Sequence, residues 1–424
     1  MSTVSPIVIA VTMAACAAVA AQVSFEQTIR DLGSSDAGVR LHAVQELKGV
    51  AYPEAALPLA KLVNDPDDDV QLEAIAAELN IFLAERIVPR KRLGFVIEIR
   101  NKISADAAFM AGPTGLGPRP VPTDVLTALR AAVRDNNPRV GLEALYAFGA
   151  LAVEPEGVRR HDLLRASGAE LAGIIGAPDP AYRFAALRVL ERVFDRRRHD
   201  EPIETTVGDA VIAALNEKDR GIRVMAIRAL GSMRYDRAVQ SLTELFQYHG
   251  KGDTAEAALD AMARIAHPSS APLFSAALTG KNSTFKGIAI EGLARLGDHS
   301  ALTAIRAALG AERGDGVQLA GAFAAVVLGA ASVDPLTEAL QRSRLRDQAW
   351  RYAVEAAPGR TAAFARQAQA PDARLRADTA DILGLAGDPA ALAIVEPMMK
   401  DQDPHVVLAA ERAVARLRAV PPVT

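Results

Sequence analysis

The chain has 424 residues, of which 50% are hydrophobic, 4% aromatic and 23% charged, and its formal net charge at pH 7 is −3. This near-neutral balance gives no long-range electrostatic attraction to nucleic acid. Its single cysteine, Cys16, excludes a framework of disulfides within the chain. A chain of this length can hold two or three globular domains, unless internal repeats indicate one elongated array instead.

The first 21 residues have the length and composition of a signal peptide. No charged side chain occurs before Glu26, residues 6–20 are largely apolar, and Ala18-Val19-Ala20 is a small-x-small cleavage pattern. We therefore expect residues 1–21 to be a cleaved signal peptide, the mature chain to have no transmembrane span, and the protein to be periplasmic or secreted. The alternatives are a lipid anchor at Cys16, a transmembrane anchor, or an uncleaved helix on a cytoplasmic protein.

A short pattern recurs along the rest of the chain. It consists of a turn Asp or Asn, a hydrophobic residue three places later, and a small residue four places after that, as in Asp36–Val39–Ala43. Asp is a favourable helix N-cap, and Pro at the first helical position loses no hydrogen bond, so each copy predicts a turn followed by a helix. Further copies begin at Asp67, Asn137, Asp179, Asp219, Asn282, Asp372 and Asp403.

The spacing of these copies predicts the fold. The hydrophobic residues of successive copies are 31 residues apart between Val39 and Val70, and again between Leu375 and Val406. A repeat of this length, with apolar residues at helical spacing, is typical of stacked helix-turn-helix units. We predict an all-α fold, an α-solenoid of about eleven units, with N-terminal repeats in residues 22–85 and the main array in residues 123–420.

Residues 86–122 interrupt the array. The segment begins with basic residues, including Arg90, Lys91 and Arg92, and ends in a Gly/Pro-rich stretch that cannot form a regular helix. It is either a binding loop that projects from the repeats or a divergent unit with a poorly ordered connector.

The stretches LARLGDHSALTAIRAAL (293–309) and LGLAGDPAALAIVEPMM (383–399) resemble HEAT repeats of the short bacterial type called phycobilisome-lyase-like. The resemblance implies a solenoid that binds other proteins. It also implies a ladder of ion pairs between units, each joining a turn aspartate to the basic residue four places later, while Gln71 and Gln318 would break the series. The expected pairs are Asp36 with Arg40, Asp179 with Arg183, Asp219 with Arg223, and Asp372 with Arg376.

The sequence contains no catalytic, cofactor or metal motif. None of the seven histidines has a second His or Cys at metal-ligand spacing, and the His-Glu dipeptides of one iron-binding HEAT-like enzyme family are absent. Phosphate-binding glycine loops and nucleophile motifs are also absent. The basic clusters in residues 158–165 and 194–200 include aspartates, and we interpret them as solvated loops.

Trp350 and Tyr352 stand out in a chain so poor in aromatic residues. They are candidates for a binding hot spot, since aromatic anchors dominate interfaces, or they fill the core of a divergent unit. Together these features predict a non-catalytic protein-interaction scaffold with an unidentified protein partner, exported to the cell envelope. The alternatives are a regulatory or lyase-type enzyme subunit and, less favoured, a nucleic-acid-binding protein.

Overall fold

The computed structural model describes residues 25–84, 104–152, 160–193 and 203–419. These residues are helical and contain no β-strand, so the fold is all-α as expected. The chain divides into two compact units: residues 1–116 with 121–157, and residues 158–424 with 117–120. The predicted signal peptide, Cys16, the basic residues Arg90, Lys91 and Arg92, and the basic cluster 194–200 lie outside the described residues.

The described residues of the first unit form three repeat hairpins and one short helix between them. Residues 25–31 form a helix ahead of α2. The elements that follow are α2 (Ala37–Val50), η1 (Pro53–Ala55), α3 (Ala56–Ala60), η2 (Lys61–Asn64), α4 (Asp68–Phe82), α5 (Ala105–Ala111), η4 (Pro113–Gly115), α6 (Thr123–Ala132) and α7 (Pro138–Leu151). Helices α2 and α4 pack together, as do α4 and α7, so the second helices of successive hairpins form one layer.

The described end of the interrupting segment is packed into this first unit. Helix α5 lies against α7, where Phe109 contacts Tyr146 with ring centroids 5.5 Å apart. The amide of Ala84 donates a hydrogen bond to the Gly115 carbonyl at 2.7 Å, and Leu116 is buried. Residues 104–116 therefore belong to the first unit, and their only regular elements are α5 and η4.

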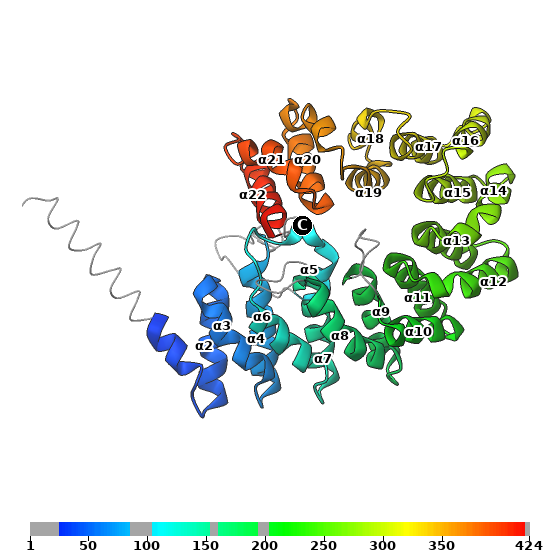
Figure 1. The fold of residues 1–424 in the computed structure, drawn as a ribbon. Coiled ribbons are helices and arrows are strands. Elements are labelled where there is room, and N and C mark those ends of the chain that lie inside the picture. The colour runs from blue at the N-terminus through cyan, green and yellow to red at the C-terminus, as the bar shows by residue number, and fades with distance from the viewer. Residues whose placement is uncertain (1–24, 85–103, 153–159, 194–202, 420–424) are drawn as a thin grey trace, which may run out of the picture. The chain divides into compact units, whose positions relative to one another are not determined.

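The second unit is built from hairpins of the same kind (Figure 1). Its elements are α8 (Arg160–Ile175), α9 (Pro180–Val193), α10 (Thr205–Ala213), η5 (Ala214–Asn216), α11 (Arg220–Met233), η6 (Asp236–Ala238), α12 (Val239–His249), α13 (Asp253–Ile265), η7 (Pro268–Ser270), α14 (Ala271–Thr279), α15 (Ser283–Arg295), α16 (Ala301–Gly310), α17 (Asp315–Val327), α18 (Asp334–Ala339), α19 (Arg346–Ala356), η8 (Thr361–Phe364), η9 (Gln367–Gln369), α20 (Ala373–Ala386), η10 (Pro389–Ala391), α21 (Leu392–Met398) and α22 (Pro404–Ala419).

Two layers of helices make up this second unit. The second helices of the hairpins stack in chain order, α9 on α11, α11 on α13, α13 on α15, α15 on α17, and so on to α22. Figure 1 shows the first helices, such as α12, α14 and α16, on the other side of this stack. Each hairpin of the second unit thus contacts the hairpins before and after it in the sequence, which is the architecture of an α-solenoid.

Small residues allow the second helices to approach closely. A methyl group added at Gly384 in α20 would lie 2.6 Å from the Cα atom of Ala413 in α22. One added at Gly231 in α11 would lie 2.8 Å from the Cα atom of Ala261 in α13. Backbone atoms cannot give way as flexible side chains do, so these glycines set the spacing between neighbouring repeats.

Candidate functional site

The turn aspartates of the repeat pattern cap the second helices. The carboxylate of Asp36 accepts a hydrogen bond at 2.7 Å from the amide two residues later, and Asp372 accepts one at 2.8 Å. Asp179 and Asp219 also accept amide hydrogen bonds at the starts of α9 and α11. These side chains therefore satisfy amides of the first helical turn, which have no partner within the helix.

The arginines of the pattern find their carboxylates in the following turn. Arg40 donates from Nε and Nη2 to both oxygens of Asp65, each at 2.7 Å. Arg376 makes the same two-pronged contact with Asp401, each bond 2.8 Å long. In both cases the acidic residue lies two places before the next cap, so the pairing within one turn that we expected is replaced by a pairing between successive turns.

Three further residues follow or vary this arrangement. Arg183 forms an ion pair with Glu217, with Nε and Oε1 3.2 Å apart. Gln71, which we expected to break the series, donates to Asp135 at 2.9 Å. Arg223 bonds to its own turn, from Nη1 to the backbone carbonyl of Glu217 at 2.7 Å. The ladder thus joins neighbouring repeats and includes an uncharged member.

The ladder shifts the proton equilibria of its members. The hydrogen bond from Arg376 lowers the pKa of Asp401, and the hydrogen bond to Asp65 raises the pKa of Arg40. Charge-assisted, two-pronged contacts of this kind favour the ionised form of both partners. The ladder therefore works as a structural device that fixes the register between repeats.

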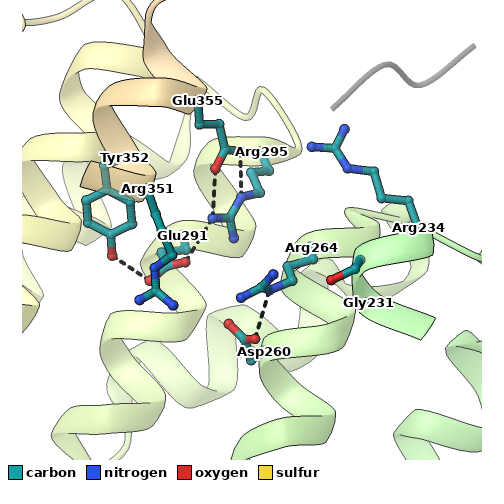
Figure 2. Close-up of a pocket in the computed structure, with 10 residues that line it drawn as sticks. Gly231, Arg234, Asp260, Arg264, Glu291, Arg295, Arg351, Tyr352 and Glu355 are labelled. Carbon is teal, nitrogen blue, oxygen red and sulfur yellow. Dashed lines mark hydrogen bonds and ion pairs between the residues drawn. The ribbon is translucent and has the colours of Figure 1, made fainter. Parts of the chain in front are cut away.

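A charged pocket lies on the second-helix layer of the second unit, and we take it as the candidate functional site. It lies near the C-terminal ends of α11, α13 and α15 and on α19, and its volume is about 60 Å³. Figure 2 shows its arginine side chains extending from different helices into one region. These arginines are Arg234, Arg264, Arg295 and Arg351, and the carboxylates around them are Asp260, Glu291 and Glu355.

Arg295 is the centre of the pocket's hydrogen-bond network. Its Nε and Nη2 donate to the two oxygens of Glu355 at 2.8 and 3.1 Å, and Nη2 lies 2.9 Å from a Glu291 oxygen. Burial by itself would lower the pKa of Arg295, but the charges of Glu355 and Glu291 raise it well above its usual value. Arg295 therefore remains charged, and it ties α15 to α19 (Figure 2).

Tyr352, which we named as a candidate binding residue, is buried and contacts this network through its hydroxyl group. Its side chain is 1% exposed and stacks on Phe323 at a centroid distance of 4.4 Å. Its hydroxyl donates to Glu291, while Gln348 donates to the same hydroxyl at 2.7 Å. Burial and the Glu291 charge raise the pKa of Tyr352 well above its usual value. Trp350, also on α19, is half-buried and does not line the pocket.

Two donor groups that line the pocket have no acceptor. Within the described part of the chain, the hydroxyl of Ser232 and the Nη1 atom of Arg295 are buried and make no hydrogen bond. Ser232 is only 5% exposed, so water cannot readily compensate it. A buried donor without a partner is costly, so each of these two groups needs an explanation, such as a bound water, ion or ligand.

Sequence reasoning missed every pocket residue except Tyr352, although a signal is present. Phe285 occupies the hydrophobic position of its repeat, and Thr254 occupies the corresponding position of the repeat before it. Glu291 lies six places after Phe285, and Asp260 lies six places after Thr254. Arg264 follows Asp260 by four places. Arg295 follows Glu291 by the same interval. An acid and an arginine at the same repeat positions in consecutive units place charged pairs side by side on one face.

The described residues contain neither a candidate membrane span nor a candidate metal site. No helix among them is long and apolar enough to cross a membrane. No group of three or more His, Cys, Asp or Glu side chains among them is arranged to hold a metal ion.

Comparison with known proteins identifies the repeats. Residues 169–253 match the family model described as HEAT repeats. This match identifies HEAT repeats in residues 169–253, and the stacked hairpins of the described residues have an α-solenoid fold. No curated protein matches its sequence.

Several solved structures are similar to this chain. A crystal structure of an engineered protein from a structural genomics consortium has a TM-score of 0.41 and 17% identity, and it covers 93% of this chain and 99% of its own. A designed armadillo repeat protein has a TM-score of 0.36 and 17% identity, covering 63% of this chain and 97% of its own. A structure of Kap95p bound to RanGDP has a TM-score of 0.36 and 15% identity, covering 93% and 50%.

Proposed function

We propose that this chain is a non-catalytic scaffold that binds a protein partner through the second-helix layer of its second unit. The observation that carries the proposal is the charged pocket, since it gathers arginines and carboxylates of several second helices in a layer whose opposite side is packed against the first helices. HEAT repeats generally serve as interaction scaffolds, and a stack of repeats offers a long surface for many contacts.

We also propose that the chain is exported to the cell envelope and that its repeats are of the phycobilisome-lyase-like type. The support for export is the apolar segment of residues 1–21 with its small-x-small pattern. The support for the repeat type is the pattern Leu-Gly-Asp-x-x-Ala that precedes an apolar helix, as in residues 296–301.

Site-specific photo-crosslinking in the native cells tests the binding surface. A photoreactive residue replaces Asp347, which is exposed on α19 one turn before the pocket residue Arg351, or Arg228, which is exposed on α11 one turn before Ser232. The matched control replaces Tyr248, which is 85% exposed on α12 in the first-helix layer.

The scaffold proposal predicts one protein adduct that both pocket-side positions share and that the Tyr248 position lacks. Identical adducts from all three positions, or none from the pocket side, would overturn it. Mass spectrometry of the purified chain's N-terminus tests export: a chain that starts near Ala21 or Gln22 supports it, and one that retains Met1 or Ser2 refutes it.

A further inference from the structure

We propose that one edge of the second unit binds an extended acidic segment of the partner protein. This inference rests on the proposed scaffold function, and it names a second contact surface together with the chemistry of its partner. The edge consists of the turns that lead into α11, α13, α15, α17 and α19. It is the N-terminal end of these helices, whereas the charged pocket lies near the C-terminal ends of α11, α13 and α15.

A basic residue precedes each of these five helices, two places before the first helical residue. These residues, which we call the cationic row, are Lys218, Lys251, Lys281, Arg313 and Arg344. At the same position before α2, α4, α7, α9, α20 and α22 the residue is uncharged. Only 48 of the 424 residues are Lys or Arg, so overall composition does not account for a basic residue at this position in five successive repeats.

Contacts between successive repeats place the members of the cationic row next to one another. The five helices pack in chain order. An ion pair between Arg220 and Asp253 joins the start of α11 to the start of α13. Ser283, at the start of α15, donates to Glu312 in the turn before α17 at 2.8 Å, and Gln348 in α19 donates to a backbone carbonyl at the start of α17 at 3.1 Å. Neighbouring members are therefore about one helix-to-helix spacing apart, about 8–10 Å.

The side chains of the cationic row are exposed and unpaired. None of them forms an ion pair or a side-chain hydrogen bond with the described residues. Acids in the same turns are held by other cations, since Glu217 pairs with Arg183 and Glu312 pairs with Lys286. The turns before α13 and α15, residues 250–252 and 280–282, contain no acid at all. The row is therefore available to an anionic group from outside the chain.

The edge as a whole carries a positive charge. The five turns and the first helical turns that follow them contain ten Lys or Arg residues against seven Asp or Glu residues, in a chain whose net charge is −3. These residues are 217–223, 250–256, 280–286, 311–318 and 340–349. An excess of positive charge on one edge attracts a negatively charged partner and orients it there.

The spacing of the row matches an extended polypeptide. An extended chain advances about 3.3 Å per residue, so three residues span the about 8–10 Å between neighbouring members. A segment with an acid at every third position therefore presents one carboxylate to each member. Like charges at this density repel one another, which keeps the free segment extended before it binds.

Acids beside the row favour a segment over a membrane surface. Asp315 and Asp347, at the starts of α17 and α19, are exposed. A flat anionic membrane laid on this edge would face these carboxylates and be repelled by them. A single acidic segment has its charges at separate points and can follow the basic residues alone.

Peptide binding to the full chain tests the inference. The probe is a rhodamine-labelled peptide with five Glu residues, each separated from the next by one Gly and one Ser. Its control carries Gln in place of each Glu. Fluorescence anisotropy is measured at low salt, where contacts between exposed charges are strongest, and is repeated at high salt, where screening should abolish the binding.

Three double variants remove two charges each. The middle variant changes two lysines within the row, the end variant changes the first and last members of the row, and the control variant changes two exposed lysines outside it. They are Lys251→Gln/Lys281→Gln, Lys218→Gln/Arg344→Gln and Lys61→Gln/Lys400→Gln. All six side chains are exposed, so the fold should be unaffected, and thermal unfolding of each variant verifies this.

We expect the Glu peptide to bind and the Gln peptide not to bind. The middle and end variants should each weaken binding of the Glu peptide about fivefold, as the loss of two exposed charge contacts implies. The control variant should change it less than about twofold. Both the middle and the end variants matter only if the segment lies along the whole row.

The inference fails if the Glu peptide shows no saturable binding, if both peptides bind equally, if the control variant weakens binding as much as the other two, or if the end variant has no effect. Vesicles of equal parts phosphatidylserine and phosphatidylcholine test a membrane instead. Displacement of the Glu peptide by these vesicles, together with sedimentation of the unmodified chain but not of the middle variant with them, would assign the row to a membrane and overturn the inference.

The scaffold proposal is judged separately by its own photo-crosslinks. It stands if both pocket-side positions share a protein adduct while the Glu peptide fails to bind, and in that case only the inference of an acidic segment falls.

Discussion

Replacing Gly384 with alanine tests whether close contact between second helices determines the stability of the C-terminal repeats. Alanine favours a helix interior over glycine by about 1 kcal/mol, so propensity alone predicts stabilisation. The added methyl group, however, would lie 2.6 Å from the Cα and 2.7 Å from the Cβ of Ala413, about 1 Å inside ordinary contact. Overpacking of this kind costs about 1–3 kcal/mol, and here the opposing atoms are backbone, so we take the upper part of that range. The expected net effect is a loss of about 1–2 kcal/mol.

Gly173→Ala provides the matched control. Gly173 lies inside α8, in the same unit, and a methyl group added there meets nothing within 4 Å. This variant should therefore gain up to about 1 kcal/mol from helix propensity alone. Urea unfolding measures both variants, and hydrogen exchange of residues 404–419 reports whether α22 opens locally. A Gly384→Ala chain as stable as the unmodified protein, or more so, would refute the argument that this contact sets the helix spacing.

Three further predictions concern polar groups of the two units. Both carboxylate oxygens of Glu78 are buried without a partner in the described residues, and burial raises the pKa of Glu78 well above its usual value, so the folded state binds a proton that the unfolded state releases and stability falls as pH rises above about 4.3. Glu78→Met should remove this fall in stability between urea titrations at pH 4.5 and pH 8, and a variant that loses as much stability as the unmodified protein would count against the argument. Asp401→Asn should destabilise the chain at neutral pH, and its loss in free energy of unfolding should become smaller in acid. Arg376 lowers the pKa of Asp401, so the ion pair of the unmodified protein is itself lost as pH falls through that lowered pKa. A loss that stays constant across pH would contradict this. Asp381→Asn should lower the free energy of unfolding, measured by thermal unfolding, by about 3 kcal/mol, because it leaves the charge of the buried Arg412 without a partner. The double variant Asp381→Leu/Arg412→Met should recover most of this loss. Failure to recover it would show that packing and not charge stabilises this contact between α20 and α22.

The local part of the structure could be predicted from the sequence. The turn aspartates Asp36 and Asp372 cap the helices that follow them, because a cap bond joins a side chain to an amide two or three residues away and depends on no other part of the chain. The stacking of hairpins also follows from the pattern, since each unit has an apolar face that only a neighbouring unit can cover. Helix formation, helix capping and the fold class could therefore be predicted from the sequence.

Contacts between repeats depended on the register of one unit on the next. Arg40 contacts Asp65 in the following turn, and Gln71 contacts Asp135 beyond the interrupting segment. The spacing of residues within one repeat could not show whether each side chain pairs with the aspartate of its own turn or with that of the next. The α18–α19 hairpin lacks the repeat pattern, so the sequence left Tyr352 open as either core or surface; the structure makes it the buried support of the pocket.

The sequence by itself determined that this protein is an all-α array of helix-turn-helix repeats, because hydrophobic periodicity and capping act within a few residues. Only the tertiary structure brought residues as far apart as Ser232 and Glu355 into one charged pocket. That assembly depends on the rotation and spacing of each repeat on the one before, which glycines such as Gly231 and Gly384 set through close backbone contact. Such distances arise from packing between units, and no pattern within a single unit encodes them.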